Sequence, residues 1–466
     1  MKNVVAKEQE HWEYFIKHKK KIMSFVKMEL EKESLEDGGS SYLKYFYISN
    51  GSSKFMPSWL AKDIHNSFSK FFNDGRILYR YKDGKYINDG DSYFRSLAQE
   101  LLHDESKKNR IEESLYWLRN DTLSDSGTPL NKHDGLINVS NGLVNYKTGE
   151  LLPHTDERVS TVQFPVVYDP NANDEVVMKF LESVLPHDTI ETMLELIGYC
   201  LVPTTKYEKA FMFSGTGANG KSTFVNMLSA LLGKENVSNV PLQDLENNRF
   251  KSAQLYGKMA NIFADIAPTA LDKSSVFKSI VSGDSISAEY KGKDSFDFRP
   301  FAKLIFSANE LPATRDITEG FFRRWIIIPF PNQFKKHHAN PNLIHKLTTP
   351  EALSTLLNYA IQGLNRLEVN GHFTESETIN NLLNEYKKES DSIATFVEEK
   401  CDLGAWGECT STKELFEAYE KWCVEMDYST IKKREFNKRI QTDYNLNRTR
   451  KYRSSSESWE GILLNT

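Results

Sequence analysis

The chain has 466 residues, of which 39% are hydrophobic and 26% charged, and its formal net charge is −5. About three domains are expected, since one domain usually holds roughly 150 residues, and the composition excludes wholesale disorder. No run of about 18 apolar residues occurs, so we expect no membrane span and no signal peptide, and predict a cytoplasmic protein. The four cysteines form no C-x-x-C pair, which predicts neither a disulfide framework nor a zinc site.

The residues that precede the phosphate-loop region are predicted to form three segments, and residues 42–120 carry no recognisable catalytic motif. Residues 1–40 are predicted to form a charged, amphipathic helix, whose lysines are typical of a solvated face, followed by a Gly-Ser linker. Residues 41–150 are predicted to form an α+β accessory domain, with a hairpin of strands 135–139 and 143–146. Residues 151–205 are assigned to a helical collar for oligomerisation, since apolar residues recur at helical spacing from 176 to 201.

Residues 215–223 read GTGANGKST and satisfy the phosphate-loop pattern G-x-x-x-x-G-K-[ST]. An apolar strand precedes them at 210–213, and an amphipathic helix follows that ends at Gly233. Glycines let consecutive N–H groups face a phosphate, while a lysine reaches the β and γ oxygens and a serine hydroxyl serves Mg²⁺. The pattern predicts an ATP and Mg²⁺ site formed by Gly215, Thr216, Gly217, Ala218, Asn219, Gly220, Lys221, Ser222 and Thr223.

Two later strands end in polar residues. The apolar run 259–264 ends in Asp265, where a phosphate-loop fold places a ligand of the Mg²⁺ site. The run 303–308 ends in Asn309, which is placed like a sensor that hydrogen-bonds the attacking water. Each could instead only cap a turn. Arg323 and Arg324 precede a strand at 325–328, and the pair is either a surface salt-bridge group or a contact to a neighbouring subunit's nucleotide.

In their order and spacing these motifs resemble superfamily 3 DNA helicases, of the branch found in phage, plasmid and poxvirus primase-helicases. The resemblance covers most of residues 45–466, and it is carried by residues 215–223, Asp265, 282–293, 307–312 and 323–325. It implies an α/β fold with an AAA+-like P-loop ATPase core at 206–335, assembled as a ring, usually a hexamer, with ATP sites between subunits. A helical connector at 336–390 and a C-terminal winged-helix DNA-binding domain at 391–466 complete the expected architecture.

The resemblance also assigns roles to single residues. Lys221, Ser222 and Thr223 match the Walker A residues, Asp265 the Walker B acid and Asn309 the sensor. The expected catalytic residues are therefore Lys221, Asp265, Asn309, Arg323 and Arg324, and the expected metal ligands are Ser222 and Asp265. Either arginine could be the finger. Many related ATPases have Asp-Glu where Asp265 stands between Ala264 and Ile266, so the water-activating base is unassigned.

Two basic regions are candidates for DNA contacts. Lys291 and Lys293 match the family's hairpin that projects into the central channel, and the nearby Tyr290, Phe296 and Phe298 suit stacking on bases. Between residues 432 and 453 nine basic residues stand against two acids, which predicts a DNA-backbone contact, with a solvated charged helix as the alternative. The candidates in that region are Lys432, Lys433, Arg434, Lys438 and Arg439.

The sequence thus predicts an ATP-dependent, ring-forming DNA helicase that unwinds duplex DNA during replication of a phage, plasmid or other mobile element. Its predicted partners are single-stranded DNA in the channel, duplex DNA at the winged helix, further copies of itself and other replication proteins. The alternative is an ATP-switched replication initiator that recruits a separate helicase. A small-molecule P-loop kinase leaves the Lys291 hairpin and the arginine pair unexplained, and no primase carboxylate cluster is found before Tyr42.

Overall fold

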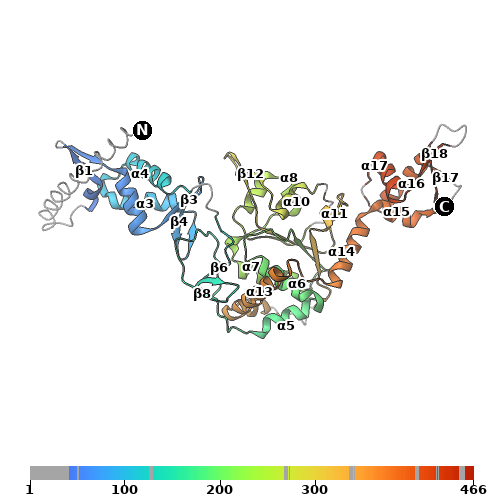
Figure 1. Cartoon of the computed structure of the whole chain (residues 1–466), viewed down its shortest axis with the longest axis horizontal. Helices are drawn as coiled ribbons and strands as arrows, with labels where there is room; N and C mark the ends of the chain where they lie inside the picture. The colour runs from blue at the N-terminus through green and yellow to red at the C-terminus, as the bar shows by residue number, and fades with distance from the viewer. Residues whose placement is uncertain are drawn as a thin grey trace, which may run out of the picture. The chain divides into compact units, whose positions relative to one another are not determined.

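The computed structural model describes residues 41–49, 52–124, 130–266, 271, 273–334, 340, 342–404, 409–426, 428, 430–450 and 457–465. The chain divides into two compact units, Met1–Thr128 and Pro129–Thr466 (Figure 1). The predicted helix and linker at 1–40 lie outside the described residues. Among the described residues, no helix combines the length and the apolar character needed to cross a bilayer.

The first unit mixes helices with antiparallel strands, as the sequence predicts. A hairpin and a three-stranded sheet alternate with helices around a core in which Leu60, Ile64 and Phe94 are fully buried. In chain order the elements are η1 (Ser41–Tyr45), β1 (Phe46–Ser49), β2 (Ser52–Phe55), α2 (Pro57–Asp63), η2 (Ile64–Phe68), β3 (Phe71–Asn73), β4 (Leu78–Lys82), β5 (Lys85–Ile87), α3 (Gly90–Leu102), η3 (His103–Glu105) and α4 (Lys108–Asp121).

The second unit begins with a small antiparallel sheet that packs into its main core. The sheet consists of β6 (Leu136–Val139), β7 (Gly142–Asn145) and β8 (Leu151–Leu152). Val139 pairs with Gly142, which confirms the predicted hairpin. Ile137 and Val144 share one hydrophobic cluster with the helices α5 (Glu175–Val184) and α6 (Ile190–Tyr199). The predicted boundary at residue 150 therefore falls inside this unit, and the helices predicted as a collar pack against its central sheet.

The centre of the second unit is a five-stranded parallel sheet in the order β10-β11-β14-β9-β15. Its strands are almost entirely buried, as expected for a parallel sheet covered on both faces. The α/β class predicted from the sequence is confirmed, and the sheet has the arrangement of a P-loop ATPase core. The strands are β9 (Ala210–Ser214), β10 (Val237–Ser238), β11 (Ala260–Phe263), β14 (Lys303–Ala308) and β15 (Trp325–Pro329).

Alternating side chains of the sheet pack into two separate hydrophobic cores, one on each face. Phe211 and Phe213 of β9 share one core with the helices at 175–184, 190–199, 221–232 and 350–370, whereas Met212 shares the other with the helices at 242–247, 275–282 and 377–390. Helices therefore cover both faces. They are η4 (His187–Thr189), α7 (Lys221–Leu232), η5 (Lys234–Asn236), α8 (Leu242–Asn247), α9 (Arg249–Ser252), η6 (Ala253–Leu255), α10 (Ser275–Ser282), α11 (Glu319–Phe322), α12 (Leu343–Leu347), α13 (Pro350–Asn370) and α14 (Glu377–Ser390).

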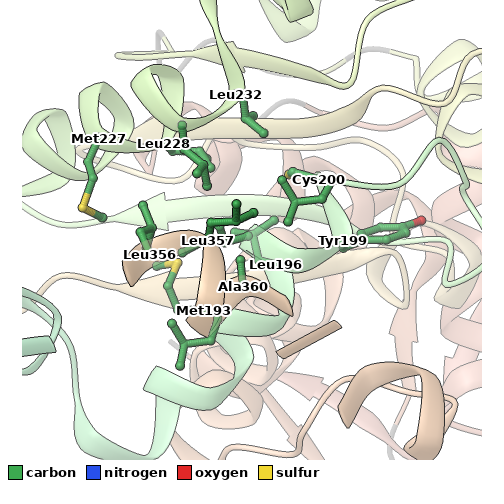
Figure 2. Close-up of a cluster of buried hydrophobic side chains, with 14 of the residues drawn as sticks. Met193, Leu196, Tyr199, Cys200, Met227, Leu228, Leu232, Leu356, Leu357 and Ala360 are labelled. Carbon is green, nitrogen blue, oxygen red and sulfur yellow. The ribbon is translucent and has the colours of Figure 1, made fainter. Parts of the chain in front are cut away.

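Helix α13, which the sequence places in a connector, is a central part of the core. The Thr349 hydroxyl accepts the Ala352 N–H at 3.2 Å to cap its start, and Gly371 ends it with φ at 74°. Leu356 and Leu357 are fully buried. Figure 2 shows these side chains meeting those of α6 and α7, so the helix that follows the phosphate loop rests on α6 and α13.

Two further parts of the second unit extend from this core. A hairpin is formed by β12 (Ile286–Glu289) and β13 (Ser295–Phe298). The C-terminal module has a core of its own, with Tyr419, Phe436 and Trp459 fully buried. Its elements are α15 (Ser392–Lys400), β16 (Cys401–Leu403), β17 (Cys409–Ser411), α16 (Thr412–Glu425), α17 (Lys433–Asp443), β18 (Arg448–Arg450), β19 (Glu457–Glu460) and β20 (Ile462–Leu464).

Candidate nucleotide-binding site

The phosphate loop, residues 215–223, connects β9 to the first turn of α7. Gly217, Ala218 and Gly220 have φ values of 98°, 49° and 91°, a left-handed conformation that favours glycine. At Gly220 space matters as well, because a Cβ there would lie 2.6 Å from Cγ1 of Val184. The loop therefore turns tightly against α5 and opens toward the N-terminus of α7, where free N–H groups favour an anion.

Lys221 joins the loop to the neighbouring strand end. Its ammonium donates to the Gly215 carbonyl and to Oδ1 of Asn309, the latter at 3.4 Å. The residue is only 5% exposed. Burial lowers the pKa of the Lys221 ammonium, and the charge of the Asp265 carboxylate opposes this shift. The structure thus brings together three of the residues predicted from separate motifs.

Asp265 follows β11 in a left-handed conformation, with φ at 56°. Its N–H donates to Oγ of Ser307 at 3.2 Å, and the next N–H, of Ile266, donates to the Ser307 carbonyl at 2.9 Å. Ser307 lies on β14, two residues before Asn309, and is 3% exposed. Ser307 was missed from the sequence, although a polar residue inside a buried apolar strand was a usable signal.

The arrangement fits a nucleotide with Mg²⁺. Ser222, Asp265 and Asn309 are exposed at the same edge of the sheet, where the carboxyl ends of β9, β11 and β14 meet. A hydroxyl, a carboxylate and an amide are oxygen donors of the kind Mg²⁺ takes, usually through water. The mainly buried Lys221 supplies a positive charge beside them. ATP phosphates and Mg²⁺ are thus chemically matched to the residues present.

The arginine pair lies at the opposite edge of the same sheet. The Ala210 N–H donates to the Arg324 carbonyl at 2.7 Å, and Trp325, the next residue, pairs with Ala210 at the start of β9. The phosphate loop follows the other end of β9, a strand of five residues. With about 3.3 Å per residue, the two edges are roughly 13–16 Å apart. The pair is therefore remote from the phosphate loop of its own chain.

The two arginines differ in how they are held. Arg324 donates to Oγ of Ser282 at 2.8 Å and to the Gly320 carbonyl, and its side chain is 11% exposed. Arg323 is 53% exposed and contacts Glu208 at 3.0 Å through one guanidinium nitrogen. Arg323 is the one with room to reach another molecule.

The β12–β13 hairpin presents its basic turn to solvent. Lys291 and Lys293 are exposed, and Gly292 between them has φ at 77°. Tyr290 is 41% exposed and stacks on Phe296 with ring centroids 5.2 Å apart. Phe298, which the sequence suggested as a stacking residue, is buried at 8% exposure because it belongs to the core below the sheet edge. Of the three aromatic residues that the sequence suggested for stacking, Tyr290 is exposed, Phe296 half-buried and Phe298 buried.

The basic residues of the C-terminal module divide into two groups. Lys432, Lys433, Arg434 and Lys438 are exposed at and within α17. Arg439 instead forms two hydrogen bonds to the Asp391 carboxylate, at 2.9 and 2.7 Å, and these partners hold its pKa above the usual range. Arg439, predicted as a DNA contact, thus ties α17 to the start of α15. Lys451 and Arg453, counted in the basic region, lie outside the described residues.

Three family models match consecutive parts of the chain. Residues 5–186 match the family described as D5 N terminal like, and residues 388–462 match the family described as poxvirus D5 protein-like. Between them, residues 213–324 match a family of unknown function, DUF5906. That central match runs from the last part of β9 to the arginine pair, and so includes the phosphate loop, Asp265 and Asn309.

Two curated relatives are viral proteins. The chain is 27% identical to the candidate helicase L207/L206 of Acanthamoeba polyphaga mimivirus, over 48% of this chain and 24% of the relative. It is 22% identical to the candidate helicase 121R of Invertebrate iridescent virus 3, over 69% of this chain and 39% of the relative. The chain therefore spans about a quarter to two fifths of the length of these relatives.

The fold is similar to a solved structure, the A form apo structure of the C-terminal region of NrS-1. The match has a TM-score of 0.51 at 13% identity, and it covers 88% of this chain and all of the other. At this identity the likeness concerns the fold. It extends well beyond the central sheet, since most of the chain takes part in it.

Proposed function

The chain belongs to the D5-like branch of the superfamily 3 helicases, and from this premise we propose that it is an ATP-dependent DNA helicase acting in replication of a virus, phage or other mobile element. The observation that carries the proposal is the geometry of the sheet. Lys221, Asp265 and Asn309 converge at the carboxyl edge, and Arg323 and Arg324 stand at the other edge. Such a sheet has half of an ATP site at each edge.

At the carboxyl edge each residue is proposed to have a separate role in ATP hydrolysis. The phosphate loop would bind ATP through its N–H groups, Lys221 would stabilise the β and γ phosphates, and Ser222 and Asp265 would hold Mg²⁺, directly or through water. Mg²⁺ would supply the charge that neutralises the phosphate oxygens. Asn309, whose Oδ1 already lies 3.4 Å from the Lys221 ammonium, orients the attacking water. Phosphoryl transfer depends mainly on this positioning and charge stabilisation.

The arginine pair completes the site of a neighbouring subunit. Because it lies across the sheet from its own phosphate loop, it can reach a nucleotide only on another copy of the chain. We assign the finger to Arg323, which is 53% exposed, and an anchoring role to Arg324, which is held by Ser282. This requires association with further copies of the chain. We propose a closed ring, with a hexamer as the expected size and an ATP site at each interface.

Two surfaces are proposed to contact DNA. Lys291 and Lys293 hold one strand in the channel, assisted by stacking on Tyr290. The described elements of the C-terminal module are, in chain order, a helix, two strands, two helices and three strands. We interpret the module as a winged helix that binds duplex DNA through Lys432, Lys433, Arg434 and Lys438. Exposure of these side chains supports the assignment.

The competing function is an ATP-switched initiator that assembles on DNA and recruits a separate helicase. The two functions share the ATP site and the DNA contacts, and they differ in translocation. A strand-displacement assay with purified protein separates them, because a helicase displaces the strand only when ATP is hydrolysed. ATP-dependent binding without displacement would favour the initiator.

Mixing two inactive variants tests the shared site directly. We combine Arg323→Ala/Arg324→Ala protein with Lys221→Ala protein and measure ATP hydrolysis. In a ring some interfaces then pair an intact phosphate loop with an intact arginine, so the mixture should regain activity that neither variant has alone.

Subunit exchange is the control for the mixing experiment. Labelled protomers establish whether the two variants enter the same rings. If they exchange and the mixture stays inactive, the assignment of the arginine pair to the neighbouring site is wrong. Activity of Arg323→Ala/Arg324→Ala protein alone would contradict it as well.

A further inference from the structure

The segment that follows β15 crosses the phosphate loop of its own chain. We call residues 330–334 the strap. The Phe330 N–H donates to the Ser214 carbonyl at 2.7 Å, and the Phe334 N–H donates to the Ala218 carbonyl at 2.8 Å. The strap is thus bonded to the chain both where β9 ends and in the middle of the phosphate loop.

Side chains add three contacts between the strap and its surroundings. Nε2 of Gln333 donates to the Thr216 hydroxyl at 2.8 Å, and Nδ2 of Asn219 donates to the Phe330 carbonyl at 3.3 Å. On the other side, Nδ2 of Asn332 donates to the Ser183 carbonyl at the end of α5, at 2.8 Å. The strap therefore bridges the phosphate loop and α5.

The strap contacts particular kinds of atoms in the phosphate loop. Toward the strap the loop contributes the Ala218 carbonyl, the Thr216 hydroxyl and the Asn219 side chain, and these contacts use no backbone N–H of the loop. Backbone N–H groups are what a phosphate requires. The strap thus bonds one loop carbonyl, that of Ala218, and two loop side chains, and it leaves the backbone N–H groups of the loop to other partners.

The strap also approaches too closely for any loop residue other than glycine at one position. A Cβ on Gly215 would lie 2.6 Å from the Phe330 carbonyl oxygen. The first glycine of the phosphate-loop pattern therefore has a packing role in this protein, which is to let the strap lie against the loop.

We propose that the strap positions the phosphate loop for nucleotide binding, and that Gln333 is a positioning residue that acts through Thr216. The inference rests on the proposed function, in which this loop holds ATP. Gln333 and Thr216 are both exposed, so their hydrogen bond lies at the rim of the site and not in a core. Its removal should loosen the loop and leave the fold intact.

A double-mutant cycle on the full chain tests the proposal. The affinity for a fluorescent ATP analogue with Mg²⁺ is measured for Gln333→Ala, Thr216→Ala and the double variant. One neutral hydrogen bond predicts a Kd increase of about three- to tenfold for Gln333→Ala. Since the two side chains act through each other, the double variant should bind no more weakly than the weaker single variant. The KM for ATP should rise by a similar factor while kcat changes little.

Two control variants separate a positioning role of Gln333 from general damage to the fold. Asn247→Ala removes an exposed amide that bonds the Gln243 carbonyl of its own helix at 3.0 Å, and it should leave the Kd unchanged. If Gln333→Ala lowers the thermal midpoint, Gln333→Met, which keeps the side-chain length, must still raise the Kd. An unchanged Kd in Gln333→Ala, or additive effects in the cycle, overturns the strap proposal alone. No saturable binding by the unmodified chain overturns the proposed function together with it.

Discussion

The candidate nucleotide site at the carboxyl edge of the sheet, called here the nucleotide edge, differs in construction from the two exposed basic surfaces on the β12–β13 hairpin and α17. At the nucleotide edge Lys221 and Asn219 are 5% and 3% exposed, and each is bonded to groups far along the chain. On the hairpin and on α17 the candidate DNA contacts are exposed lysines and an arginine on short elements. The first kind of site needs fixed geometry, whereas the second needs only charge in the right region. Single substitutions should therefore act strongly at the first and weakly at the second.

The largest effect is expected at Lys221. Lys221→Ala should abolish ATP hydrolysis, because it removes the charge that stabilises the β and γ phosphates. Since the side chain is largely buried, Lys221→Met is the matched variant that keeps its packing. Steady-state hydrolysis and circular dichroism are measured for both. Near-normal turnover in a folded variant would show that the phosphate loop is not the catalytic site.

The next effect concerns the hairpin. Lys291→Ala/Lys293→Ala should reduce unwinding and single-strand binding while basal ATP hydrolysis survives. Loss of two phosphate contacts should make the slope of log K against log salt shallower by about 1.4. Lys413→Ala/Lys421→Ala removes equal charge from α16, where both lysines pair with glutamates of their own helix, and serves as control. Equal slopes for the two double variants would remove the channel role.

A third prediction concerns a buried lysine that takes no part in either site. Lys303 begins β14, and its ammonium donates to the Val202 carbonyl just beyond α6 and to the Phe301 carbonyl at 3.1 Å. Burial lowers the pKa of Lys303 to about 7. Between pH 7 and its unfolded pKa the unfolded chain binds more protons, so stability should rise with pH in this window.

Denaturant unfolding at pH 7.0 and 9.5 measures that dependence. The wild-type free energy of unfolding should increase on the order of 1 kcal/mol per pH unit over that interval, and Lys303→Met should flatten the increase. Parallel pH profiles for the two proteins would mean that another group is responsible.

The smallest effects are expected within α17, and they separate neighbouring residues. Arg439→Ala should destabilise the C-terminal module by about 2 kcal/mol, because it leaves Asp391 without its partner. Lys438→Ala should leave stability unchanged and weaken duplex binding only slightly. Thermal unfolding and fluorescence anisotropy with duplex DNA measure the two quantities. The reverse pattern would assign Arg439 to DNA and Lys438 to the fold.

The proximity of Lys221, Asp265 and Asn309 could be predicted because each belongs to a local pattern. Lys221 is part of the phosphate-loop pattern, and Asp265 and Asn309 each follow an apolar run. Parallel strands bring such strand ends together at one edge of a sheet. Gln333 and Arg439 contact Thr216 and Asp391, which lie 117 and 48 residues away in the sequence. No local sequence pattern predicts these contacts. The division of the chain between Thr128 and Pro129 likewise has no local signal, since only long-range packing places Ile137 in the second unit.

The position of the arginine pair has a consequence for how activity depends on protein concentration. If Arg323 serves only a neighbouring copy, a dilute chain is folded and binds nucleotide, yet has no complete site. Hydrolysis per subunit should then vanish on dilution and rise cooperatively as copies associate, while nucleotide binding follows no such curve. The local concentration of the protein would then control ATP hydrolysis, so subunits present in few copies would bind nucleotide without hydrolysing it.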